Sequence, residues 1–121
     1  MFTHIRTSKE NKEVVSQLSR KLGLGAENVI ARIAIAQSLE NGNKLDVKNL
    51  SDSSGKEYSK SVLLGDYEEL YLGMICTLYG IHKSHRDLGK LVKMHLDNGL
   101  QLIYEDQGST TKLIGFNFFD K

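Results

Sequence analysis

Four side chains in the second half of the chain could bind a metal ion. His82 and His85 stand three residues apart, which is a ligand-like spacing, and His95 could add a third ligand. Cys76 could complete the set. A zinc site, however, needs three or four ligands held by supporting groups, and no CxxC or HExxH element accompanies these residues. We therefore expect His82 and His85 to be surface residues in a turn and His95 to pack at the edge of a helix stripe. The sequence predicts no metal site.

Carboxylates and tyrosines offer a second kind of chemistry. Asp66, Glu68 and Glu69 are close enough in sequence to hold the divalent metal of a nuclease. Tyr67, Tyr71 and Tyr79 could act as nucleophiles in a nicking reaction. Both groups have simpler explanations, because acidic residues are favourable at a helix N-terminus and the spacing of the tyrosines suits core packing. We therefore expect no catalytic residue and no cofactor.

Charge and composition limit the class of protein. The net charge is only +1, yet residues 1–60 carry ten basic and seven acidic side chains, whereas residues 61–121 carry six and eight. A positive surface for a polyanion therefore belongs in the N-terminal half. The single cysteine excludes an internal disulfide framework, and no apolar run reaches the ~20 residues of a membrane helix. We expect one domain in a reduced, cytoplasmic protein without a membrane segment.

The N-terminal elements must position those basic side chains. Residues 1–7 alternate as a short strand, which is too short to be stable without a partner strand. Thr7 and Glu10 match a capping box for a helix that runs to about Leu22. A second helix over about 26–39 is apolar on almost every side, so it must be covered on most faces. We expect this helix to form the centre of the core and a subunit contact.

The rest of the chain predicts two further helices. Leu45–Lys48 fits a short strand or an extended link. Asp66 caps a third helix with an apolar stripe formed by Tyr67, Leu70, Tyr71, Met74, Ile75 and Leu78. Ser84 starts a fourth helix with a stripe formed by Leu88, Leu91, Val92, His95 and Leu96. We expect Gly99 to end or bend this fourth helix.

A short strand, a capped helix, a glycine turn and a very apolar second helix follow in the order of a ribbon-helix-helix unit, as in Met-repressor-like proteins. In such a unit the N-terminal strands of two protomers pair into a ribbon, and four helices bury one shared core. The ribbon would enter the major groove and present His4 and Arg6 to base edges. The start of the second helix, near Gly25, Ala26 and Asn28, would offer free amides to a phosphate.

Five stretches carry a resemblance to a known family: Arg6–Glu13, Leu18–Leu24, Asn28–Ala34, Gly73–Cys76 and Val92–Leu100. Together they resemble the DndE family, the small component of the bacterial DNA phosphorothioation system. The resemblance covers roughly residues 2–104 and does not extend to the C-terminal tail.

The resemblance implies a DNA-binding accessory protein with a ribbon-helix-helix-like core, assembled as a homo-tetramer. It implies binding to duplex DNA, with a preference for nicked duplex, beside the DndC and DndD proteins. Carried over by position, the phosphate contacts fall on Arg6, Lys9, Lys12, Arg20 and Lys21. Lys9, Lys12 and Arg20 can share one helix face, with Lys21 at its flank.

We therefore predict a mainly α, ribbon-helix-helix-like homo-oligomer that binds DNA without cutting it. Its single domain, 1–121, would contain the strand–helix–helix unit over 1–42, additional helices over 43–105 and a tail over 106–121. A ribbon-helix-helix repressor or antitoxin is the alternative, and a metal-dependent DNA nickase is a third hypothesis. Because the net charge is near neutral, strong DNA binding requires several copies to combine their basic surfaces.

Overall fold

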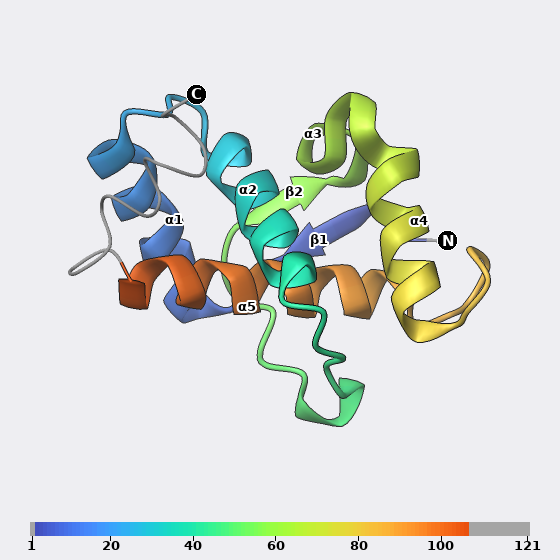
Figure 1. Cartoon of the computed structure of the whole chain (residues 1–121). Helices are drawn as coiled ribbons and strands as arrows, with labels where there is room; N and C mark the ends of the chain where they lie inside the picture. The colour runs from blue at the N-terminus through green and yellow to red at the C-terminus, as the bar shows by residue number, and fades with distance from the viewer. Residues whose placement is uncertain (1, 107–121) are drawn as a thin grey trace.

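Two helices that cross at close range form the centre of the fold. In the computed structural model, which describes residues 2–106, α5 (Leu88–Asp106) runs along the molecule and α2 (Glu27–Glu40) crosses it (Figure 1). Gly99 lies at the crossing, where a Cβ atom would come 1.8 Å from the carbonyl oxygen of Ala34. Only a residue without a side chain allows the two backbones to approach this closely. Of the two alternatives predicted for Gly99, a helix end or a bend, the helix end is wrong, because α5 continues to Asp106.

The cover that the apolar sequence of α2 requires comes from the same chain. Residues 27–39 are all at least partly buried, and α2 packs against α5 and α1 (Lys9–Leu22). The stripe predicted for the fourth helix is confirmed as well. Its five members are all buried, and they are Leu88, Leu91, Val92, His95 and Leu96.

The first helix begins one residue later than the capping pattern predicts. Ser8, not Thr7, is the N-cap of α1, and its hydroxyl accepts a hydrogen bond from the backbone N–H of Asn11 at 3.2 Å. The Thr7 hydroxyl accepts instead from the backbone N–H of Lys56 at 2.9 Å. The helix ends at Gly23, whose φ of 64° lies in the left-handed region that glycine adopts without strain.

The predicted N-terminal strand is present, but its partner lies in the same chain. β1 (His4–Arg6) pairs antiparallel with β2 (Glu57–Ser59), and Ile5 stands opposite Tyr58. A ribbon-helix-helix dimer would pair β1 with its copy in a second protomer. Here β2 takes one edge of β1, so the strand has a partner without a second chain. Ile5 and Tyr58 point into the core, whereas His4 and Arg6 are exposed.

The stretch between α2 and α4 holds the elements that sequence reasoning missed. The short strand or extended link predicted over Leu45–Lys48 is wrong for its second half, because Val47 and Lys48 belong to a 3-10 turn, η1 (Val47–Asn49). β2 follows this turn. Next come α3 (Lys60–Leu64), a second 3-10 turn, η2 (Gly65–Tyr67), and α4 (Glu68–Tyr79). Asp66 lies within η2 and forms no side-chain cap on α4, so its predicted capping role is wrong.

No helix in the described part of the chain is long and apolar enough to cross a membrane. The predicted tail over 106–121 lies outside the described residues, except for Asp106 at the end of α5.

Candidate nucleic-acid interface

The outer face of α1 carries four of the predicted DNA-contact residues. Lys9, Lys12, Arg20 and Lys21 are all exposed. With roughly 3.6 residues per turn, the first three lie on the side of α1 opposite the buried Leu18, and Lys21 lies at the flank of that side. None of the four makes an ion pair with any residue in 2–106. Their charges are therefore available to an anion outside the chain.

Two acidic residues lie among these cations: Glu10, which is exposed in the first turn of α1, and Glu13. Glu13 is exposed and stands four residues after Lys9, so the two side chains are neighbours on the same side of α1. Like the cations, Glu13 has no ion-pair partner within the described residues. Its negative charge lowers the local positive potential and weakens the attraction of this face for a polyanion.

The two residues predicted to meet base edges are separate from the α1 face. Arg6 on β1 is held by Glu57 on β2, because its Nε donates to Oε1 at 2.7 Å. That hydrogen bond and the positive charge of Arg6 lower the pKa of Glu57. His4 is exposed, and its Nδ1 lies 3.0 Å from the hydroxyl of Thr3. The exposed side of β1 thus carries His4 and Arg6, and Arg6 is already paired with the carboxylate of Glu57.

The start of α2 is a poorer phosphate site than its sequence predicts. Its N-cap, Ala26, makes no side-chain cap, but Glu27 already places a carboxylate in the first turn. This carboxylate accepts a hydrogen bond from the Ser16 hydroxyl at 2.8 Å and lies 3.8 Å from the Lys56 ammonium. A phosphate at these amides would meet that negative charge.

A buried polar network fixes the start of α1 against α5. The ammonium of Lys93 pairs with the carboxylate of Asp97, and it also donates to the carbonyl oxygen of Asp52 at 2.8 Å. The other oxygen of Asp97 accepts from the Ser8 backbone N–H at 3.1 Å and from Asn11 Nδ2 at 2.7 Å. Sequence reasoning missed this network, although Lys93 and Asp97 have the i, i+4 spacing of a helical ion pair.

Asp52 extends the network to the basic face. Its carboxylate accepts the backbone N–H groups of Lys9 at 2.9 Å and Ser54 at 3.1 Å, and these two bonds lower the pKa of Asp52. Lys93 holds the carbonyl of the same residue. The first residue of the α1 face is thereby tied to the loop at 51–54 and, through it, to α5.

His95 is a structural histidine rather than a metal ligand. Its ring is fully buried, with the Ser38 hydroxyl 2.7 Å from Nδ1 and the Tyr79 hydroxyl 2.8 Å from Nε2. Each hydroxyl also accepts a second hydrogen bond, Tyr79 from the Leu45 backbone N–H at 2.7 Å and Ser38 from Asn98 Nδ2 at 2.8 Å. The neutral ring donates to one of these hydroxyls and accepts from the other. Burial lowers the pKa of His95 to about 4, so the ring is neutral at pH 7.

The other metal candidates do not converge on a common point. His82 and His85 are exposed in the turn before α5, and Cys76 is half-buried on α4. His85 Nδ1 accepts the backbone N–H of Asp87 at 3.0 Å. Within residues 2–106 no group of three or more His, Cys, Asp or Glu side chains is arranged to hold a metal ion.

The residues near the start of α4 that were considered as catalytic candidates are Glu69, Tyr71 and Tyr67, and each has a different environment. Glu69 forms an exposed ion pair with Lys83 at 2.8 Å, and this pair lowers the pKa of Glu69. Tyr71 is half-buried, and burial raises its pKa. Tyr67 is 56% exposed, so the core role predicted for it is wrong.

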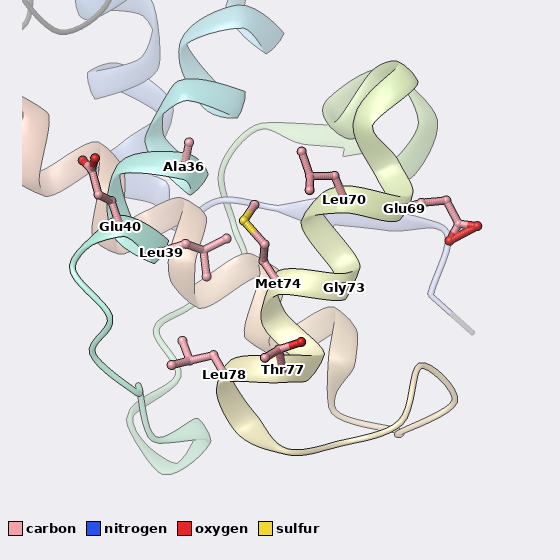
Figure 2. Close-up of a pocket in the computed structure, with 9 residues that line it drawn as sticks. All are labelled: Ala36, Leu39, Glu40, Glu69, Leu70, Gly73, Met74, Thr77 and Leu78. Carbon is pink, nitrogen blue, oxygen red and sulfur yellow. The ribbon is translucent and has the colours of Figure 1, made fainter.

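The apolar stripe of α4 is largely uncovered. Of the six residues predicted to be buried, only Ile75 is fully so, whereas Leu70 is 57% and Met74 37% exposed. Leu70 and Met74 border a groove of about 760 Å³ between α2 and α4. Figure 2 shows Leu39 and Met74 directed into the space between the two helices. The groove is lined by Ala36, Leu39, Glu40, Glu69, Leu70, Gly73, Met74, Thr77 and Leu78.

A family model described as DNA sulphur modification protein DndE matches residues 4–111 of this chain. The chain belongs to the DndE family. The resemblance that the sequence stretches carry is thereby confirmed over most of the chain. A comparison with curated proteins found no match.

Solved DndE structures share the fold. The crystal structure of DndE from Escherichia coli B7A, involved in DNA phosphorothioation modification, is 18% identical, with a TM-score of 0.69. A DndE mutant with two glycines replaced by lysine, also described as involved in DNA phosphorothioation, is 17% identical, with a TM-score of 0.70. Each comparison covers 85% of this chain and 98% of the other. The mainly helical architecture is therefore that of DndE.

Proposed function

We propose that this chain is a DNA-binding accessory protein of the DNA phosphorothioation system. It binds duplex DNA through the outer face of α1, with a preference for nicked duplex. The observation that carries the proposal is a set of exposed cations without ion-pair partners in residues 2–106, on a member of a DNA sulphur modification family. The set consists of Lys9, Lys12, Arg20 and Lys21. Each cation that neutralises a phosphate releases counterions, so binding weakens steeply with salt.

The contacts favour recognition of the backbone over recognition of sequence. Lysines on an exposed helix face meet phosphates, which carry no sequence information. The side chains suited to base edges are His4 and Arg6, and Arg6 is already bonded to Glu57. A sequence-specific repressor or antitoxin is less well supported for this reason, and because β1 has its partner strand in the same chain.

The proposed role is non-catalytic. The chain supplies DNA contacts, binds no cofactor or metal, and acts beside DndC and DndD in the cytoplasm. The sulfur chemistry then belongs to those partners. A nickase is less well supported, because Glu69 is paired with Lys83 and the acidic residues at the start of α4 form no metal-binding group within the described residues.

Self-association through the α2–α4 groove completes the proposal, with a second copy of the chain as the occupant. Leu70 and Met74 are four residues apart, which gives α4 an exposed stripe of the kind that packs against another helix. On α1 only four described cations lack an ion-pair partner, so several copies are needed to build an extended basic surface. A homo-oligomer, with a tetramer as the expected form, would cover the exposed stripe of α4 and combine the basic surfaces of several copies.

Nicked-duplex binding in a salt series tests the DNA function. Replacing Lys9 and Lys12 by glutamate should abolish binding to nicked duplex while the mass of the oligomer in solution stays unchanged. Lys44→Glu with Lys48→Glu is the matched control, because both residues are exposed and lie outside α1. Unchanged binding by the α1 variant, or equal loss in the control, would refute the assignment of the face.

Sedimentation tests the self-association face. Leu70→Lys with Met74→Lys should yield a monomer, whereas Val62→Lys, which changes an exposed apolar residue outside the groove, should leave the oligomer intact. A wild-type chain that sediments as a monomer would contradict the oligomer itself.

A further inference from the structure

A second basic site lies beside β1, where three distant parts of the chain meet. A cavity of about 260 Å³ opens between the residues before and in β1, the loop at 50–53, and the first turns of α5. Eight described residues line it: Phe2, Arg6, Leu50, Ser53, Arg86, Gly89, Lys90 and Lys93. Four of these eight are cationic and none is acidic. The lining thus concentrates positive charge around a space large enough for several water molecules.

The cations of this cavity are not equally free. Lys93 is buried, and its ammonium is occupied by Asp97, Ser51 and the carbonyl of Asp52. Arg6 gives its Nε to Glu57 but keeps the rest of its guanidinium for another acceptor. Lys90 lies at 3.8 Å from Asp87, which is a loose and exposed pair. Arg86 is exposed and makes no ion pair with residues 2–106. The available donors are therefore Arg86, Lys90 and part of Arg6.

The backbone on one side of the cavity also favours an anion. Gly89 and Lys90 belong to the first turn of α5, which carries the positive end of the helix dipole. In this turn the N–H groups of Leu88 and Leu91 already donate to the carbonyl oxygens of His85 and Asp87. Gly89 is needed for close packing here, because a Cβ atom at that position would lie 2.8 Å from Cβ of Phe2. The first turn of α5 is thereby packed against the chain that leads into β1.

The cavity and the start of α1 are connected through the loop at 50–53. Ser53 lines the cavity, and its neighbour Asp52 accepts the backbone N–H of Lys9. Lys93 at the base of the cavity holds the same Asp52. The start of α1 and the cavity are thus joined through Asp52, which is exposed and acidic.

We propose that this cavity is a seat for one phosphate group of the DNA backbone, held by Arg86 and Lys90. Arg6 and Ser53 complete the rim, and the apolar surfaces of Phe2 and Leu50 lie against the adjoining sugar. The inference rests on the proposed DNA function and adds to it a contact on β1 and α5, apart from α1. A planar guanidinium beside an ammonium and the first turn of a helix is an arrangement that binds phosphate oxygens well.

The test combines two probes on the full chain. Inorganic phosphate, followed by amide chemical shifts, should move the signals of Ser53, Gly89 and Lys90 in the wild type but not in Arg86→Gln with Lys90→Gln. A short nicked duplex, followed by fluorescence anisotropy across a salt series, should bind this variant about threefold to tenfold more weakly. The slope of log K against log salt should fall by about 1, as expected for the loss of one phosphate contact.

Lys44→Gln with Lys48→Gln removes the same charge outside the cavity and should leave the slope unchanged. Equal slopes for the cavity variant and the wild type, on DNA that the wild type binds, would overturn the phosphate seat and leave the DNA function standing. Phosphate-induced shifts in a wild type that binds no DNA would overturn the DNA source and reassign the cavity to free phosphate. Equal weakening by both variants would reduce the effect to general charge and overturn the proposal.

Discussion

The crossing of α2 and α5 makes a strong prediction about Gly99. A methyl group added by Gly99→Ala would come 1.8 Å from the carbonyl oxygen and 2.4 Å from the carbonyl carbon of Ala34. Both atoms belong to the backbone of a buried helix, so no side-chain rotation relieves the clash. Overpacking of this kind costs about 3 kcal/mol or more when the backbone must move. The helix propensity of alanine returns about 1 kcal/mol, so the net loss should be about 2 kcal/mol or more.

The matched control is Gly73→Ala in α4. A Cβ atom at Gly73 would meet nothing within 4 Å in its own chain, so the propensity gain of about 1 kcal/mol should remain. Because Gly73 lines the α2–α4 groove, the mass of this variant in solution is measured alongside its stability. Urea unfolding followed by circular dichroism measures both variants. With a slope of roughly 2 kcal/mol per molar urea, Gly99→Ala should lower the midpoint by about 1 M, and Gly73→Ala should raise it by about 0.5 M. A Gly99→Ala variant as stable as the wild type would show that the two helices do not cross at this point.

Three further predictions follow from single side chains. Below pH 6.5 the unfolded chain protonates His95, whereas the folded chain does so only near its pKa of about 4. The free energy of unfolding should therefore fall by up to about 3 kcal/mol as the pH is lowered from 6.5 to 4. Urea unfolding of His95→Gln at several pH values should lack this pH dependence. Asp97→Asn leaves the buried ammonium of Lys93 without its carboxylate and should cost about 3 kcal/mol in the same assay, whereas Lys93→Met with Asp97→Asn should cost less. Glu13→Gln removes the negative charge from the α1 face and should tighten duplex binding by anisotropy; weaker binding would mean that DNA does not contact this face.

Local periodicity predicted the long helices well. α1 and α2 lie within one or two residues of their predicted bounds, and the buried stripe of α5 is correct from Leu88 to Leu96. These features depend on neighbours three and four residues apart, which a sequence displays directly. The end of α5 was mispredicted for a related reason. Glycine is a common helix terminator, but at Gly99 the missing side chain serves the contact with α2 instead.

Contacts between residues that are far apart in the chain could not be predicted from the sequence. β2 and α3 are three and five residues long, too short for a periodic pattern, and β2 is defined by its register with β1 more than fifty residues earlier. The stripe of α4 shows a different limit. Its spacing correctly indicates an apolar side, but a spacing does not say whether the cover comes from the same chain or from another. The same limit applies to Arg6, because its partner Glu57 comes from the distant β2.

The distribution of ion pairs, rather than the net charge, identifies the candidate nucleic-acid interface. A net charge of +1 argues against a DNA-binding protein, yet the ion pairs are unevenly distributed. Glu57, Glu68 and Glu69 neutralise cations on β1, α3 and the turn before α5, while the cations of α1 have no such partners within residues 2–106. A polyanion responds to the potential over a surface about a Debye length across, roughly 10 Å, and not to the sum over the chain. Acidic side chains that are already paired on other elements therefore do not cancel the α1 face, whereas Glu10 and Glu13 on α1 itself reduce its potential. The number of unpaired cations on one continuous surface is the quantity that should govern affinity.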